Sequence, residues 1–137
     1  MSEVDAEQLK VLVVDDHLTV RTQIQNHLKG MKFSHVDQAA NVDEATNKMA
    51  ATRYNIVFLD WHMPGKSGYY LLQKCREDRA YDDVAFIVVS AESENRHIIE
   101  ALKAGATSYI VKPYSENTLV EHVTKTLNWI GRNRAKA

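Results

Sequence analysis

The chain alternates short, continuous apolar runs with longer stretches of helical period, and this alternation restricts the fold more than any other feature. The runs at 11–14, 55–59 and 84–90 are apolar at successive positions, apart from Asn55 and Ser90 at their ends, which is typical of strands buried on both faces of a parallel sheet. Residues 33–39 alternate apolar and polar side chains, and 107–111 form another short apolar run. Five strands are therefore expected.

Five helices are expected between and after these strands, at residues 18–29, 42–49, 69–76, 92–104 and 116–130. In the first and last of them, apolar residues recur every three or four positions, which predicts one buried face. Gly30 and Gly105 stand where the first and fourth helices should end. Asn41 and Ser115 stand where the second and fifth helices need an N-cap.

This order of elements predicts a doubly wound α/β domain, in which right-handed crossovers place helices on both faces of a parallel sheet. A length of 137 residues suits one domain, expected to span residues 9–131, with 1–8 and 132–137 as flexible termini. Because no second domain is expected after the last helix, a stand-alone protein is favoured. Ligands of such sheets bind beyond the carboxyl ends of the strands.

Charge and composition exclude several classes of protein. The formal net charge of −1 gives no electrostatic reason to expect direct binding to nucleic acid or to a membrane. No apolar stretch approaches the roughly 20 residues that span a bilayer, and residues 1–10 lack the pattern of a secretory signal. Cys75 is the only cysteine, which excludes a disulfide framework within the chain and a multi-thiolate zinc site. A cytoplasmic protein is expected.

Polar side chains gather at the carboxyl ends of the expected strands. Asp15 and Asp16 follow the first strand and Asp60 ends the third. Ser90 ends the fourth strand and Lys112 follows the fifth. Three neighbouring carboxylates repel one another, and a divalent cation relieves that repulsion. Oxygen ligands without cysteine or histidine spacing favour a hard ion, and Mg²⁺ leaves room for phosphate oxygens.

The same group of side chains suits a phosphoryl group. Transfer of a phosphoryl group depends mainly on positioning and on charge neutralisation, which a metal ion, a lysine and a hydroxyl provide together. A carboxylate can itself accept the group and form an acyl phosphate. Asp60 stands alone at the end of its strand and is the natural acceptor.

Four segments resemble the signature segments of receiver domains of two-component response regulators, and they occur in the order found in that family. They are VLVVDDH, IVFLDWHMPGKSG, IVVSAE and YIVKPY. The resemblance covers about residues 9–131 and is to receivers of the CheY-like type. It implies a flavodoxin-like or CheY-like sheet with the strand order 2-1-3-4-5, an order that the alternation alone leaves open.

The family implies roles for the charged residues, position by position. Asp60 matches the phosphoryl acceptor, and Lys112 matches the lysine that pairs with the phosphoryl group. Asp15 and Asp16 match the acidic pair that binds Mg²⁺, for which Mn²⁺ is an alternative. Asp60 and the backbone carbonyl of His62 match the remaining protein ligands of this ion.

The resemblance also indicates which residues change conformation. Ser90 matches the switch hydroxyl that moves to a phosphoryl oxygen, and Tyr109 matches the aromatic residue that moves inward on activation. The Lys112–Pro113 peptide bond is cis in the family. Trp61 matches a fluorescent residue beside the acceptor, whose quenching would report metal and phosphate binding.

Two histidines stand near the expected pocket. Neither His17 nor His62 has the carboxylate–histidine spacing of a metal ligand. Glu92, two residues after Ser90, should face the side chain of His62 across the entrance of the pocket. We expect this pair to tune hydrolysis of the acyl phosphate by helping or hindering the attacking water.

The resemblance implies a signalling switch. A histidine kinase or phosphotransfer protein would phosphorylate Asp60, and the face formed by the fourth helix, fifth strand and fifth helix would control binding of a downstream protein. Ile98, Tyr109 and Tyr114 are expected to be exposed there and are the apolar candidates for that contact. The chain would be a monomer or a dimer linked to phosphorylation. It would catalyse its own phosphorylation and slow hydrolysis without being a metabolic enzyme.

Three alternatives remain open. A receiver cut from a larger response regulator or a hybrid histidine kinase would carry the same motifs. A magnesium-dependent phosphohydrolase also uses an aspartate nucleophile, but it usually has a second aspartate two residues later, where this chain has His62. A pseudo-receiver that only binds partners is disfavoured by the complete acidic set and by Lys112.

Overall fold

A computed structural model describes residues 4–136 and confirms the doubly wound fold. The five parallel strands have the order β2-β1-β3-β4-β5, as the resemblance implied. The strands are β1 (Lys10–Val14), β2 (His35–Ala39), β3 (Ile56–Asp60), β4 (Ala85–Ser90) and β5 (Ser108–Val111). The helices are α1 (Leu18–Gly30), α2 (Val42–Ala51), α3 (Gly68–Arg76), α4 (Asn95–Lys103) and α5 (Glu116–Lys136), with short 3₁₀ helices η1 (Ala6–Gln8) and η2 (Arg79–Tyr81).

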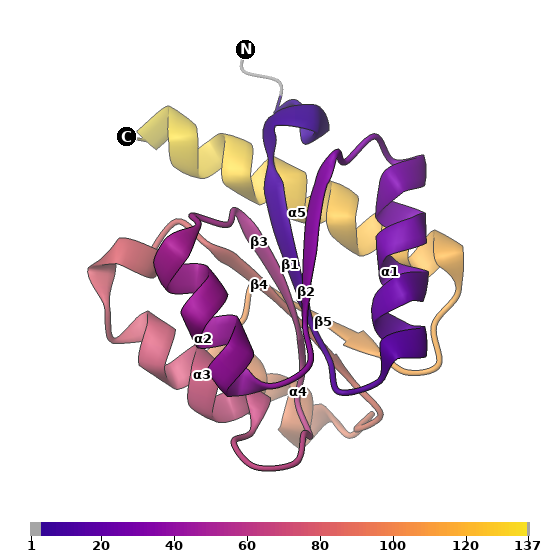
Figure 1. Cartoon of the computed structure of the whole chain (residues 1–137), viewed down its shortest axis with the longest axis vertical. Helices are drawn as coiled ribbons and strands as arrows, with labels where there is room; N and C mark the ends of the chain where they lie inside the picture. The colour runs from indigo at the N-terminus through magenta and orange to yellow at the C-terminus, as the bar shows by residue number, and fades with distance from the viewer. Residues whose placement is uncertain (1–3, 137) are drawn as a thin grey trace.

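Two apolar layers hold the sheet between its helices. Successive side chains of a strand point to opposite faces, so Leu12 and Val14 pack toward α2, α3 and α4. Val11 and Val13 pack on the other face, toward α1 and α5. Figure 1 shows α1 on one side of the sheet and α2 and α3 on the other. Both faces are buried, which explains why the central strands are apolar at successive positions.

The ends of the helices confirm three of the four expected signals. Asn41 accepts the Glu44 N–H at 2.8 Å, and Ser115 accepts the Thr118 N–H at 3.1 Å. Gly105 follows α4 with a φ of 111°, a conformation that favours glycine.

α1 ends at Gly30, as expected, but Gly30 does not adopt the left-handed conformation of a C-terminal cap. The positive φ of 74° falls on Lys32. The Phe33 N–H then reaches back to the Leu28 carbonyl at 3.1 Å, and the Phe33 side chain is buried. The buried ring of Phe33 therefore anchors the turn after α1.

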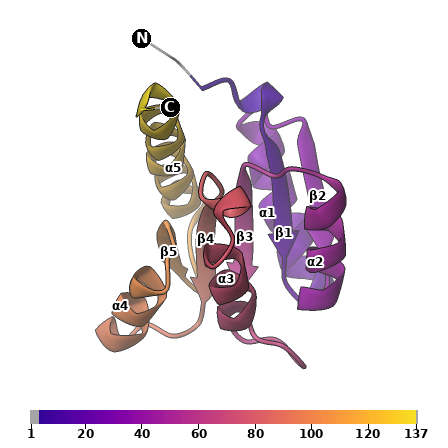
Figure 2. The same ribbon diagram turned by 90° about the vertical axis from the view of Figure 1, so that its left-hand side faces the viewer.

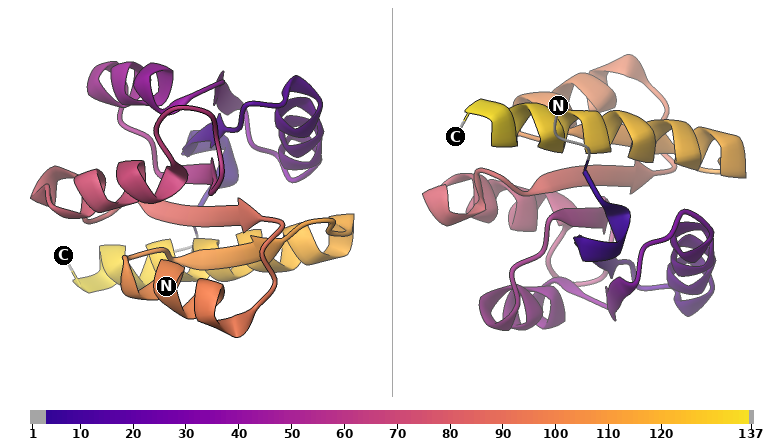
Figure 3. Two further views of the ribbon diagram at one scale, coloured as in Figure 1. Left: turned by 90° about the horizontal axis from the view of Figure 1, so that it is seen from below. Right: turned by 90° about the horizontal axis from the view of Figure 1, so that it is seen from above.

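Two helices differ from their expected ranges. α4 begins at Asn95, three residues later than expected, because the chain after Ser90 is held in a separate turn described below. α5 continues to Lys136, where the sequence suggested a flexible tail from residue 132 (Figure 3). The expected flexibility of residues 1–3 and 137 lies outside the described residues. Within residues 4–136 no helix has both the length and the apolar character needed to cross a bilayer.

Candidate functional site

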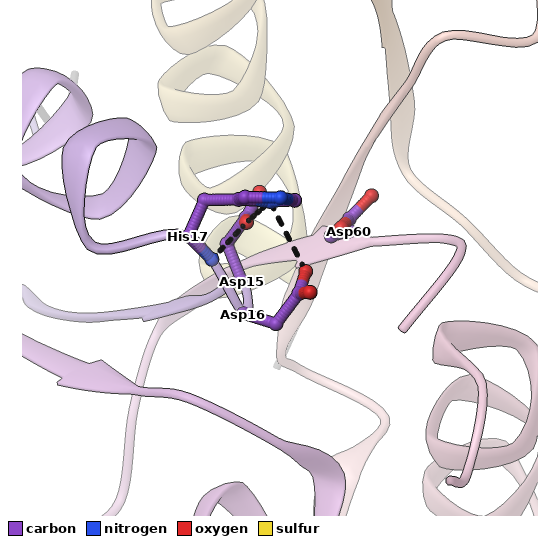
Figure 4. A group of neighbouring side chains, drawn as sticks. All are labelled: Asp15, Asp16, His17 and Asp60. Atoms are coloured by element: carbon purple, nitrogen blue, oxygen red, sulfur yellow. Dashed lines mark hydrogen bonds and ion pairs between the residues drawn. The ribbon is translucent and has the colours of Figure 1, made fainter. Parts of the chain in front are cut away.

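The carboxyl ends of β1 and β3 meet because the two strands are parallel neighbours. Val14 is paired with Leu59, so the next residues, Asp15 and Asp60, emerge side by side. The left view of Figure 3 looks onto this end of the sheet. Figure 4 shows Asp15, Asp16 and His17 at the junction of β1 and α1, with Asp60 beside them at the end of β3.

The three expected carboxylates do form one group. Asp15, Asp16, Asp60 and His17 each offer a ligand atom, and these atoms all lie within 4.8 Å of one another. Asp15 is 2% exposed and Asp60 is 5% exposed. The two buried charges are therefore poorly screened by water, and their repulsion is large unless a cation offsets it.

Lys112 supplies part of that positive charge. Its Nζ lies 3.1 Å from Oδ2 of Asp15 and 3.4 Å from Oδ1 of Asp60. The Lys112 N–H also donates to the Ser90 carbonyl at 2.8 Å, which continues the β4–β5 pairing and places the lysine opposite the acids. The Lys112–Pro113 peptide bond is cis, as the resemblance implied.

The net environment of Asp60 disfavours its charge. Burial is the largest cause of a raised pKa at Asp60, followed by the negative charge of Asp15. Lys112 and the His62 N–H oppose this and lower the pKa of Asp60, but they do not cancel it. A carboxylate held in this way gains from any further positive charge brought to it.

Gly68 allows the start of α3 to pack closely against Asp60 at the end of β3, because glycine has no side chain. A Cβ atom at residue 68 would lie 2.2 Å from the backbone oxygen of Asp60, closer than any allowed contact. The Gly68 N–H donates to the Trp61 carbonyl at 3.1 Å, which folds the loop after β3 back on itself. The first turn of α3 thus packs directly against the end of β3.

Ser90 and Tyr109 are joined through one loop. Ser90 is fully buried, and its Oγ accepts the Glu92 N–H at 3.1 Å. The Tyr109 hydroxyl donates to the Glu92 carbonyl at 2.8 Å, and Tyr109 is 8% exposed. Tyr109 therefore already occupies a buried position, and the loop after β4 connects the expected switch hydroxyl to the expected switch ring.

His62 and Glu92 do face each other, and a third residue joins them. Nε2 of His62 lies 3.3 Å from Oε1 of Glu92. Nε2 of His97, in the first turn of α4, lies 3.4 Å from Oε2 of the same carboxylate. Sequence reasoning missed His97, although its place five residues after Glu92 and at the start of a helix was a usable signal.

The exposed apolar residues on the expected partner face differ from those anticipated. Figure 2 shows α4, β5 and α5 next to one another at one side of the molecule. Tyr109 is buried and Ile98 and Tyr114 are only partly exposed, whereas Ile99 and Leu102 of α4 are 50% and 45% exposed. The expectation that Tyr109 offers an exposed contact is therefore wrong, because its ring packs into the core beneath α4.

The acidic group fits a divalent cation. Oδ1 of Asp16 is buried and has no hydrogen-bond partner among residues 4–136. Buried polar atoms are normally paired. Because no neighbouring group bonds this oxygen, it is available to bind a ligand. Three carboxylates contributing only oxygen atoms suit a hard ion with several retained waters.

The fold and this site define a class of protein that sequence comparison also finds. A family model for the response regulator receiver domain matches residues 11–124, and the chain belongs to that family. It is a receiver domain homologous to those of CheY proteins, which is consistent with a phosphoryl-accepting signalling switch and does not favour the phosphohydrolase alternative.

Among individual relatives, chemotaxis proteins match most of the chain. CheY-3 of Vibrio cholerae is 34% identical over 117 residues, covering 85% of this chain and 90% of that protein. CheY of Pseudomonas aeruginosa is 33% identical and covers 85% and 94%, respectively. The solved structure of Vibrio cholerae CheY4 superposes with a TM-score of 0.80 at 26% identity, covering 86% of this chain and 98% of that one. These matches to regulators of similar size do not favour the fragment alternative.

Proposed function

We propose that Asp60 accepts a phosphoryl group from a phosphohistidine on a histidine kinase or phosphotransfer protein. The observation that carries this proposal is the buried Asp60 carboxylate, which Lys112 faces at 3.4 Å and two further carboxylates adjoin. A kinase donor would place the exchange in the cytoplasm. The protein would assist its own phosphorylation and would end in a binding state instead of releasing a product.

Asp60 is a better acceptor than Asp15. Oδ1 of Asp15 already accepts the His17 N–H at 2.8 Å, and Oδ2 faces Lys112 at 3.1 Å. In the transfer, a carboxylate oxygen of Asp60 forms a bond to phosphorus while the phosphorus–nitrogen bond to the donor imidazole breaks. The electron pair of that bond stays on the imidazole nitrogen. Lys112 neutralises charge on the incoming group, which is the main requirement of such transfers.

Asp15, Asp16, Asp60 and the backbone carbonyl of His62 would hold Mg²⁺, with Mn²⁺ as the alternative ion. This assignment is supported by the shared position of the three carboxylates and by the unpaired oxygen of Asp16. When bound, the ion supplies positive charge next to the phosphoryl oxygens and relieves repulsion among the acids.

Ser90 would carry the change from Asp60 to the partner face. Its Oγ would leave the Glu92 N–H to donate to a phosphoryl oxygen, and this would release the turn that delays the start of α4. Because Tyr109 is bonded to the Glu92 carbonyl in the same turn, its ring would be repositioned together with α4. The exposed side chains of Ile99 and Leu102 would then meet a downstream protein differently.

His62 and Glu92 would tune the lifetime of the acyl phosphate. Their side chains meet at 3.3 Å, and we expect them to stand where a hydrolytic water approaches Asp60. Replacing either residue by alanine should change the rate of dephosphorylation. Two unchanged rates would remove both residues from this role.

Phosphorylation with a small donor tests the proposal directly. The protein is incubated with Mg²⁺ and acetyl phosphate, and its intact mass is measured. A gain of one phosphoryl group is expected in the wild type and in Asp83→Asn, which changes an aspartate whose side chain is 79% exposed. The gain should vanish in Asp60→Asn. An Asp60→Asn protein that still gains the group would overturn the assignment, and no gain in any protein would support the pseudo-receiver alternative.

A further inference from the structure

His17 lies inside the acidic group although sequence reasoning kept it out of the metal ligands. Its Nδ1 is 3.2 Å from Oδ1 of Asp15 and 3.2 Å from Oδ1 of Asp16. Figure 4 shows the imidazole ring lying across the two aspartates. His17 occupies the N-cap position of α1, but its side chain makes no capping hydrogen bond. The ring is therefore directed at the acids and not at the helix end.

A hydrogen bond does not account for this position completely. Nδ1 meets the geometry of a hydrogen bond with Asp15 only. Asp16 Oδ1 remains without a hydrogen-bond partner in the described part of the chain, although Nδ1 is equally near. Two ligand atoms that sit at right angles, each about 2.1 Å from one ion, lie about 3 Å apart. The observed spacing of 3.2 Å suits neighbouring ligands of a single ion.

We propose that His17 Nδ1 is a ligand of the same ion as Asp15, Asp16 and Asp60, and that it makes the site favour Mn²⁺ over Mg²⁺. The proposal rests on the metal site of the proposed function. Imidazole nitrogen binds later divalent metals better than Mg²⁺, which prefers oxygen atoms and water. A nitrogen ligand added to the oxygen ligands of the site would change the order of preference among ions and leave the phosphoryl acceptor unchanged.

Trp61 provides the measurement. It is 6% exposed and directly follows Asp60 in the sequence, so its fluorescence should respond to an ion bound by the acids. Mg²⁺ and Mn²⁺ are titrated into the wild type, His17→Phe and His35→Phe. Phenylalanine keeps a ring at residue 17 without the nitrogen, and the side chain of residue 17 is 66% exposed, so folding is not at risk. His35→Phe is the matched control, because His35 is exposed at the start of β2, at the end of the sheet opposite to the acidic group.

The expected result is a change in the ratio of the two dissociation constants. His17→Phe should weaken Mn²⁺ binding by about tenfold or more, and Mg²⁺ binding by less than about threefold. His35→Phe should leave the ratio at its wild-type value. Pulsed electron paramagnetic resonance of bound Mn²⁺ should show an imidazole nitrogen coupling that disappears in His17→Phe.

The refuting results are distinct from a failure of the proposed function. If His17 only supplies positive charge or a hydrogen bond, His17→Phe shifts both constants by the same factor and the nitrogen coupling is absent from the wild type. Either finding removes His17 from the ligands while phosphorylation of Asp60 stands. If neither ion binds any of the three proteins, the metal site itself is wrong and the proposed function fails with it.

Discussion

Replacing Lys112 by methionine should destabilise the metal-free protein, because two buried carboxylates lose their cation. Nζ lies 3.1 Å from Asp15 and 3.4 Å from Asp60. At an effective dielectric constant of about 20 each attraction is on the order of 5 kcal/mol, most of which offsets desolvation of the charges. Removing one partner of a fully buried pair costs roughly 3–5 kcal/mol. Lys112 is 23% exposed, so we expect a loss of about 2–3 kcal/mol in the free energy of unfolding.

The loss in the free energy of unfolding should depend on pH, and its direction follows from the raised pKa of Asp60. Burial and Asp15 raise the pKa of Asp60 above its ordinary value of 3.8, and Lys112 opposes them. Without Lys112 the pKa of Asp60 rises further. A carboxyl group with a higher pKa in the folded protein than in the unfolded chain lowers stability above the folded pKa and has no such effect below the unfolded one. The cost of Lys112→Met should therefore be full near neutral pH and shrink toward pH 4.

Urea unfolding in the presence of a chelator, followed by tryptophan fluorescence, measures this cost. Adding Asp60→Asn to Lys112→Met should recover at least about half of the loss, because one of the stranded charges is removed. Lys125→Met is the matched control and should change stability by less than about 0.5 kcal/mol, since its pair with Glu121 is exposed. A loss of equal size at both ends of the pH range would refute the reasoning. So would a loss that Asp60→Asn does not reduce.

Three further substitutions test other contacts. Gly68→Ala should lower acetyl phosphate labelling about tenfold or more, because the added carbon would lie 2.2 Å from the Asp60 oxygen; wild-type labelling would show that the loop adapts. Arg76→Met should lower the free energy of unfolding in urea by about 2–4 kcal/mol, since the guanidinium donates to three carbonyls at 2.8–2.9 Å. The control Arg96→Met, at an exposed residue, should lower it by less than about 0.5 kcal/mol. Equal losses in the two variants would contradict this prediction. Tyr109→Phe should cost about 1 kcal/mol and speed amide exchange in the loop after β4, and unchanged exchange would show that its hydroxyl does not hold the loop.

Sequence reasoning predicted the elements well where the pattern is local. Continuous apolar runs identified the strands, and the N-cap at Asn41 and the positive φ at Gly105 were confirmed. The start of α4 was placed three residues too early, and the left-handed residue after α1 was not anticipated at Lys32. The start of α4 depends on a contact made after folding, namely the bond of the Ser90 hydroxyl to the Glu92 N–H.

The sequence by itself determined the kind of sheet and the chemistry at its edge. Apolar runs at successive positions require a sheet covered on both faces, and parallel strands bring their terminal acids to one end. Only the tertiary structure decided which of those groups touch. Lys112 and Asp15 are 97 residues apart in the chain. Their side chains form a hydrogen bond because the sheet places the ends of β1 and β5 at the same edge, with only β3 and β4 between them. The approach of His17 to the acids and of His97 to Glu92 likewise depends on side-chain directions that spacing does not encode.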